Sequence, residues 1–242
     1  MISFNFSVVT DYGFVFLRGL AITTLLTVVV IALAGVLAIP LAVARLSDKR
    51  WVRWPADLFV EVVRATPLIL QLIYIYYVLP AAGIRLEPIS AAIIGLTLNY
   101  SAYMSEVYRG GIQAVPKGQR EAAAALGLRP FVMLRKVILP QAIRIVLPAL
   151  GNYLIALFKD TALASVVTVQ ELMFSGQIVA ARNYQYFTVY TITGILYFAV
   201  GYPSALVVRR LERWSQRGWG LGRRDARAPM PYGQKSAPGS GV

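Results

Sequence analysis

The distribution of apolar and polar residues divides the chain into five long apolar segments joined by polar, mostly basic stretches. The segments occupy residues 22–43, 66–82, 89–104, 143–158 and 187–208. A helix of about 20 apolar residues crosses the hydrocarbon core of a bilayer, and several of these runs approach that length. The pattern therefore predicts an all-α integral membrane protein with about five transmembrane helices.

Local signals predict where these helices begin and end. The first segment is too long for a signal peptide, and it lacks a basic start and a small-residue cleavage site. The second helix is expected to begin near Pro55, since proline suits the first helical turn, and then to cross as residues 66–82. Gly110 and Gly111 are expected to end the third helix. Residues 161–181 are too mixed to span, so we expect a helix there that lies near one membrane face.

Basic residues gather on one side of this predicted arrangement. All but four of the 24 Lys and Arg residues fall on that side, the exceptions being Arg18, Arg85, Lys159 and Arg182. Because Lys and Arg are enriched in cytoplasmic loops, five spans place the N-terminus outside and the C-terminus in the cytoplasm. The formal net charge of +13 therefore reflects topology, and no nucleic-acid partner is expected.

The same reading divides the chain into three parts. Residues 1–13 are expected to be an external N-terminal segment, and residues 14–214 to form one transmembrane domain. Residues 215–242 are basic and rich in Pro, Gly and Ser, a composition that cannot bury a core. We expect this last part to be a disordered cytoplasmic tail.

Composition excludes most enzyme chemistry. The chain is 57% hydrophobic and only 14% charged, against about 25% charged residues in soluble domains. It contains no Cys and no His, which removes disulfides, thiolate and imidazole metal sites and His-based acid–base catalysis. Glu106 and Asp160 alone do not make a catalytic site. We therefore expect a membrane protein that is not an enzyme and that holds no metal.

Five polar residues within or beside the apolar segments are candidates for a substrate path, because polar groups that face lipid are costly and usually turn inward. They are Thr66, Gln71, Asn99, Ser101 and Glu106. For Gln71 and Asn99 the alternative is an interhelical hydrogen bond, and Thr66 has the alternative of capping a turn. Glu106 follows Asn99 by seven residues and so falls near the same helix face. It could bind a substrate ammonium or guanidinium, or pair with Arg109 one turn later.

The polar stretch 115–141 has the features of a short helix that projects from the membrane. Pro116 can open a helix, residues 121–126 are strong helix formers, and Gly127 can end it. The alanines leave a smooth surface that another protein can approach closely, and Leu126 and Leu128 can fill a pocket in that protein. The alternative is a solvated connection between two spans.

Two groups of residues in this stretch match a known pattern. They are Glu121-Ala122-Ala123 with Gly127 after three further residues, and Val137-Ile138-Leu139-Pro140, in which Val137 stands where the pattern usually has Ile. These residues resemble the EAA loop of permease subunits in ABC importers. Three further motifs resemble the polar amino acid branch of that family: EVVRATPL at 61–68, YRGGI at 108–112 and LFKDTALAS at 157–165. The resemblance covers about residues 14–213.

This resemblance implies the type I ABC importer permease fold and a division of labour between subunits. It implies a second permease, identical or related, a cytoplasmic dimer of ATPases, and an external binding protein that delivers a polar amino acid. The residues that would dock on the ATPase are Glu121, Ala122, Ala123, Leu126, Gly127 and Leu128. Lys159 and Asp160 lie within one of the matched motifs, and the resemblance favours a role in an outer gate over a role as simple anchors at the membrane interface.

The source of energy separates the two transporter classes that the sequence allows. The chain contains no Gly-x-x-x-x-Gly-Lys-Ser/Thr phosphate loop, so we expect no cofactor in it, with ATP bound by a partner subunit. The alternative is an ion-coupled secondary amino acid transporter. Such a transporter usually has more spans and an internally repeated half, and the sequence has no such repeat.

Overall fold

The computed structural model describes residues 4–216, and this part of the chain is built from helices. The α-helices are α1 (Ser7–Arg45), α2 (Arg50–Ala65), α3 (Leu68–Ile73), α4 (Pro88–Gln113), α5 (Lys117–Ala125), α6 (Pro130–Met133), α7 (Leu139–Asp160), α8 (Leu172–Asn183) and α9 (Tyr186–Gln216). Two π-helical turns, Tyr74–Val78 and Leu134–Ile138, and two 3-10 segments, Leu79–Ala82 and Thr161–Val167, extend α3, α6 and α7. The predicted all-α fold is confirmed. The predicted tail lies outside the described residues, apart from the end of α9.

Three helical segments of the described chain are long and apolar enough to cross a membrane: Ser7–Arg45, Pro130–Val167 and Tyr186–Arg213. A fourth crossing is possible if α2 and the segment Leu68–Ala82 count as one bent span. Helix α4 has 26 residues, but its buried face carries polar residues such as Asn99 and Ser105. The chain is therefore a multi-pass membrane protein, and the count of five spans stays a prediction.

Helix α1 begins well before the predicted first span. It starts at Ser7, so residues 7–13 of the expected N-terminal segment belong to the helix, and the external position of that segment stays a prediction. The early start has a packing reason, because Val8 and Phe16 are buried against Leu172 and Val179 of α8 and Val189 of α9. At 39 residues α1 is about 58 Å long, nearly twice the thickness of a hydrocarbon core. At least one of its ends therefore projects beyond that core or the helix is strongly tilted.

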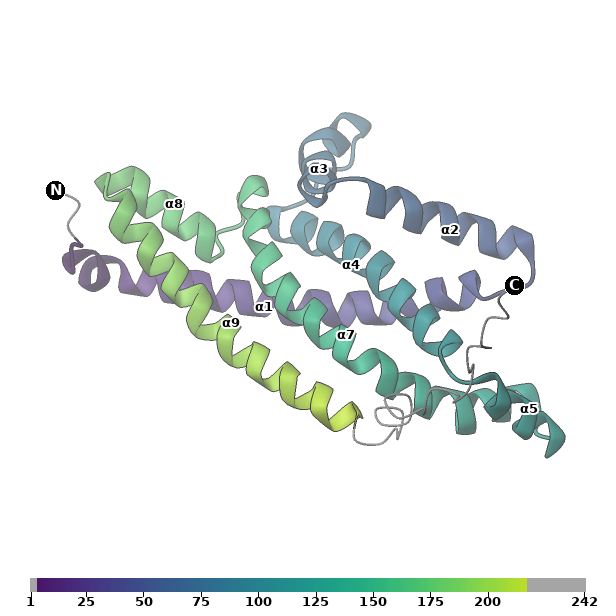
Figure 1. The fold of residues 1–242 in the computed structure, drawn as a ribbon. Coiled ribbons are helices and arrows are strands. Elements are labelled where there is room, and N and C mark those ends of the chain that lie inside the picture. The colour runs from purple at the N-terminus through teal and green to yellow at the C-terminus, as the bar shows by residue number, and fades with distance from the viewer. Residues whose placement is uncertain (1–3, 217–242) are drawn as a thin grey trace, which may run out of the picture.

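The second predicted span is broken. Helix α2 begins at Arg50, five residues before Pro55, and it does not continue into 66–82, because the chain bends by 104° between α2 and the following helical segment. The bend follows from Pro67, whose ring disfavours helical dihedrals at the preceding residue, and Thr66 is indeed extended. Figure 1 shows α2 running beside α1 and α4, while the chain after α2 turns out of line with it at α3, which still contacts α4.

Helix α4 does not end at its paired glycines, as the sequence predicted, but continues through Gly110 and Gly111 to Gln113. Gly111 serves close packing instead. A Cβ atom on Gly111 would lie 2.1 Å from Cγ1 of Val146 in α7, whereas a Cβ on Gly110 would meet nothing within 4 Å. Around the same helix, small side chains such as Ala34, Ala38 and Ala92 let α1 and α4 pack into the main core.

The predicted single helix over 161–181 is two elements. The 3-10 segment Thr161–Val167 ends at Thr168, which has a left-handed φ of 63°, and α8 starts only at Leu172. Glu171 begins α8, because its carboxylate accepts hydrogen bonds from the amides of Met173 and Phe174. Figure 1 shows α8 beside the N-terminal parts of α1 and α9, at the opposite end of the bundle from α5.

Candidate functional site

A pocket of about 390 Å³ lies where the break after α2 meets α4 and α7. Its walls come from three stretches of the chain that are far apart in sequence. The lining residues are Arg64, Ala65, Thr66, Pro67, Leu68, Asn99, Tyr100, Tyr103, Tyr153, Ala156 and Asp160. The pocket therefore exists because the helix break at Pro67 opens a space that a continuous helix would have filled.

A polar network holds that break in place. The Thr66 hydroxyl donates to the carbonyl oxygen of Val62 at 3.0 Å, which caps the end of α2. The Gln71 side-chain amide donates to Thr66 Oγ1 and to the Val63 carbonyl oxygen, each at 2.7 Å. Asn99 Nδ2 on α4 donates to Gln71 Oε1 at 3.1 Å. The capping and interhelical roles foreseen as alternatives for these residues are therefore present, and Thr66 and Asn99 also line the pocket.

Opposite charges line the same pocket. The Arg64 guanidinium lies over the ring of Tyr103, 5.5 Å from its centroid. Asp160, near the end of α7, accepts a hydrogen bond of 2.7 Å from the Tyr100 hydroxyl. Tyr153 packs edge-on against Tyr100, with ring centroids 6.2 Å apart. The space thus offers a cation, a carboxylate, amide and hydroxyl groups, and aromatic walls.

The remaining predicted site residues lie elsewhere. Ser101 is fully buried, and its hydroxyl donates to the Leu98 carbonyl oxygen at 2.8 Å, so it has no place in the lining. Lys159 is exposed on α7, whereas the adjacent Asp160 lines the pocket, so the two residues of the predicted gate point to different surroundings. Glu106 is bound by arginines.

Glu106 belongs to an ion cluster that joins α1, α2 and α4. Arg45, whose side chain is only 9% exposed, donates to Asp57 at 2.7 Å and to Glu106 at 2.5 Å. Arg109 pairs with the other oxygen of Glu106, which is the alternative to substrate binding that the sequence offered for Glu106. Arg64 reaches the cluster at 4.0 Å from Glu106 and so lies between the cluster and the pocket. Glu106 is therefore no free carboxylate for a ligand.

Sequence reasoning missed the aromatic residues of the pocket and the part played by Arg64. Helical spacing contained a signal for some of them. Asn99 and Tyr103 are four residues apart, and Tyr153, Ala156 and Asp160 follow at intervals of three and four, so each set lies on one helix face. The periodicity gives no information on which faces of α4 and α7 meet.

The predicted projecting helix is present as α5. Its end is a Schellman motif, in which the amide of Leu128 donates to the Ala123 carbonyl oxygen and the amide of Gly127 donates to that of Ala124. Gly127 is left-handed, with φ of 70°. Glu121 and Ala122 are exposed and Leu126 is 80% exposed, whereas Ala123 is buried and Leu128 is half-buried. Of the predicted docking residues, Ala123 is therefore on the face of α5 that packs against the following helical segments, and it is not exposed to a partner.

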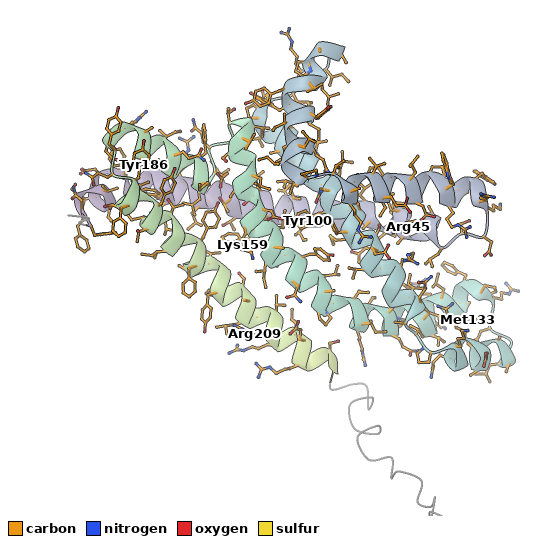
Figure 2. All side chains as sticks on the ribbon, turned by 45° about the horizontal axis from the view of Figure 1, so that its top comes forward. Arg45, Tyr100, Met133, Lys159, Tyr186 and Arg209 are labelled. Atoms are coloured by element: carbon orange, nitrogen blue, oxygen red, sulfur yellow. The ribbon has the colours of Figure 1, made fainter. Side chains whose placement is uncertain are left out.

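The pocket and α5 lie at different levels of the bundle. Figure 2 shows Tyr100 near the middle, Arg45 and Met133 towards one end, and Tyr186 at the other. Met133 belongs to α6, which follows α5 directly. The ion cluster around Arg45 thus lies on the side of the pocket that leads towards α5.

Comparison with known proteins identifies the family. Residues 31–217 match the family described as binding-protein-dependent transport system inner membrane component. The chain is 45% identical to a probable amino-acid ABC transporter permease of Sinorhizobium fredii over 74% of this chain and 78% of that protein. It is 37% identical to the histidine/lysine/arginine/ornithine transport system permease of Escherichia coli over 82% and 88%. A solved amino acid ABC transporter with histidines superimposes with a TM-score of 0.83 at 34% identity, covering 88% of this chain and 99% of that one. The chain therefore belongs to the family of binding-protein-dependent transport system inner membrane components.

Proposed function

We propose that this chain is the transmembrane permease subunit of an ATP-driven importer that translocates polar amino acids delivered by an external binding protein. Relatives named as amino-acid permeases support the substrate class. The observation that carries the proposal is the pocket at the helix break, with Arg64 and Asp160 in one lining. Its volume lies in the range of about 300–1,000 Å³ typical of small-molecule sites.

The chemistry of the pocket fits a zwitterion. A guanidinium binds a carboxylate well, so Arg64 is suited to the α-carboxylate of an amino acid. Asp160 is suited to the α-ammonium group, and Tyr100 orients its carboxylate. Asn99, Thr66 and Tyr103 remain for a polar side chain. Each charge of the substrate would thus meet an opposite charge in the pocket lining.

Energy is proposed to come from a cytoplasmic ATPase dimer that binds the end of the bundle with α5. The exposed parts of α5 and its C-terminal turn, Glu121, Ala122, Leu126 and Gly127, support this contact. A second permease chain completes the translocation path. In this arrangement the N-terminus is external and the C-terminus cytoplasmic, which single introduced cysteines test: Asp48→Cys and Arg85→Cys should react with a membrane-impermeant thiol reagent from opposite sides.

Uptake into vesicles tests the function as a whole. The permease, its ATPase and its binding protein are reconstituted together into vesicles. Accumulation of radiolabelled acidic, neutral and basic amino acids is then measured with and without ATP on the side of the membrane that carries the ATPase. We expect accumulation that requires ATP, with a higher KM for the variants Asp160→Asn and Arg64→Gln. Accumulation driven by an ion gradient without ATP would instead support a secondary transporter.

A further inference from the structure

Helix α2 exposes an apolar stripe that the proposed transport mechanism does not use. The stripe consists of Trp51, Trp54, Leu58 and Val62, which are 75%, 61%, 45% and 53% exposed. Their spacing of three, four and four residues places them on one helix face. The opposite face packs on α1 and α4 through the buried residues Ala56 and Val60. The stripe therefore points away from the bundle.

Basic residues surround the tryptophan end of this stripe. Lys49, Arg50 and Arg53 are all exposed, and Lys49 Nζ lies 6.0 Å from the centroid of the Trp51 ring. Asp48 is the one acidic residue between Leu46 and Trp54. The next acid, Asp57, is bound to Arg45 at 2.7 Å, and its other oxygen lies 3.9 Å from Nε of Arg53, which is still half exposed. The first two turns of α2 are therefore a positively charged surface with two exposed indoles.

The position of this surface relative to α1 identifies its surroundings. Helix α1 is long enough to cross a membrane and ends at Arg45, and α2 starts only five residues later at Arg50. The turn between them contains Ser47, Asp48 and Lys49, and a polar, charged turn at the end of a helix that can cross the membrane is suited to the bilayer surface. Trp54 is five residues into α2 from Lys49, which corresponds to about 7.5 Å along the helix axis. Both tryptophans thus lie within about 7.5 Å of Lys49 along the helix axis, close to that turn.

We propose that the first turns of α2 form a binding site for anionic phospholipids. Trp51 and Trp54 insert at the level of the headgroups, as amphipathic aromatic rings do at both membrane interfaces. Lys49, Arg50 and Arg53 bind the lipid phosphates. Leu58 and Val62 continue the stripe towards the acyl chains. This site depends only on membrane insertion of the chain and is independent of the proposed substrate.

A lipid fits this surface better than a protein partner because of how its polar groups are arranged. Along the stripe, Lys49, Arg50 and the indoles lie at one end and Leu58 and Val62 at the other, which is the order of headgroup and acyl chain in a lipid. Glu61 and Arg64, near Val62, are also exposed. The core of a protein interface is depleted in charged residues, whereas here three cations border the two largest apolar side chains. A second permease chain on the stripe is the competing occupant.

Fluorescence quenching by brominated lipids tests the proposal with the full chain in phosphatidylcholine vesicles. Replacing Trp214 and Trp219 by Phe leaves Trp51 and Trp54 as the only indoles. Brominated phosphatidylglycerol and brominated phosphatidylcholine are compared at equal mole fraction, which gives the relative association of the two lipids at the indoles. Each basic residue near the surface is expected to contribute roughly fivefold, offset in part by Asp48. Three basic residues thus give roughly 125-fold and Asp48 reduces this by about fivefold, so we expect an anionic preference of about 25-fold.

Two matched charge variants make the result specific. The triple variant Lys49→Gln, Arg50→Gln, Arg53→Gln should reduce the preference to about one or below. The triple variant Arg209→Gln, Arg210→Gln, Arg213→Gln removes the same charge from exposed positions of α9 and should leave it unchanged. Equal quenching by the two lipids in the unaltered background would overturn the proposal, as would an equal effect of both triple variants.

A reporter on α1 separates lipid from protein contact. Val36 is exposed on α1, so Val36→Trp in a chain without the other tryptophans should be quenched by either lipid. If this reporter is quenched while Trp51 and Trp54 are not, the stripe is covered by protein and the lipid site is refuted. Crosslinking of Trp54→Cys between two copies of the chain would then identify the second permease as the occupant.

Discussion

The hydroxyl of Tyr100 donates a hydrogen bond of 2.7 Å to Oδ2 of Asp160, joining α4 to α7 at the wall of the pocket. The two residues are 60 positions apart in the chain. Tyr100 is 3% exposed, so the bond forms in surroundings with little water. It therefore fixes the carboxylate that is proposed to receive the substrate ammonium.

Removing this hydroxyl should weaken substrate binding without abolishing transport. Tyr100→Phe keeps the ring and leaves Asp160 free to adopt other rotamers, so we expect KM for uptake to rise on the order of tenfold, the usual effect of one hydrogen bond to a charged group. Maximal ATP-dependent uptake should change little. Tyr190→Phe, on the exposed face of α9, is the matched control. An unchanged KM in Tyr100→Phe would remove Asp160 from the substrate site.

The arginine pairs of Glu106 predict a structural role for this residue. Glu106→Gln leaves Arg45 and Arg109 with a weaker partner, so we expect a loss of about 1–2 kcal/mol in stability, seen as a lower thermal midpoint in detergent. Glu61→Gln, on the exposed side of α2, should have little effect. Normal stability combined with altered selectivity among acidic, neutral and basic amino acids would instead assign Glu106 to the substrate.

Adjacent glycines on α4 offer a sharp test of helix packing. Gly111→Ala places a methyl group on Val146 and should destabilise the chain by about 1–3 kcal/mol, while Gly110→Ala meets open space and should be neutral or slightly stabilising. The double variant Gly111→Ala, Val146→Ala should recover part of the loss. Thermal unfolding of the four proteins in one detergent provides the comparison. Equal midpoints for the two single variants would contradict the packing of α4 on α7.

The left-handed Gly127 allows a test of the coupling role proposed for α5. Gly127→Val strains the backbone at φ of 70° and disturbs the Schellman turn that presents Leu126. We expect loss of substrate-stimulated ATP hydrolysis and uptake, and weaker retention of the ATPase during purification, with normal membrane insertion.

Gly118→Val is the control, because Gly118 lies in the first turn of the same helix with open space around it. Glu121→Lys, which reverses an exposed charge near the start of the helix, should behave like Gly127→Val if the ATPase presents a basic contact. Full uptake in both Gly127→Val and Glu121→Lys would refute the coupling role of α5.

Glu171 predicts a pH dependence of stability. Burial raises the pKa of the Glu171 carboxyl, and hydrogen bonds from the amides of Met173 and Phe174 offset this only in part. A raised pKa in the folded state means that the folded chain holds a proton which the unfolded chain has lost. The resulting stability is present below the ordinary carboxyl pKa and is lost as pH rises through the raised value.

Thermal midpoints of the unaltered chain and of Glu171→Gln, measured across a series of pH values, test this. The midpoint of the unaltered chain relative to the variant should fall as pH rises above the ordinary carboxyl range. The hydroxyls of Thr23 and Tyr197 also donate to this carboxyl, so Glu171→Gln changes the thermal midpoint at every pH. The test therefore compares how steeply the two midpoints change with pH, and not their absolute values. A relative midpoint that rises or stays flat would show that the hydrogen bonds outweigh burial.

Several parts of the structure follow from the sequence alone. Apolar runs of sufficient length determine membrane insertion and the all-α fold, because a backbone in lipid must satisfy its hydrogen bonds within each helix. The alanine run and Gly127 determine α5 and its end, since helix propensity and a left-handed glycine act over a few residues. The bend at Pro67 has an equally local cause, which the long apolar run from residue 66 to 82 concealed.

Tertiary structure decided the site. The sequence marked Thr66, Asn99 and Asp160, but only the packing of α2, α4 and α7 brought them together with Arg64 and the tyrosines. The same packing placed Glu106 among arginines and turned Ser101 into the interior. Helical periodicity specifies which residues share a face, whereas the register and rotation of one helix against another depend on side-chain fit along the whole contact, such as that of Val146 on Gly111. Partners separated by 60 residues or more are therefore determined by packing and cannot be read from local sequence.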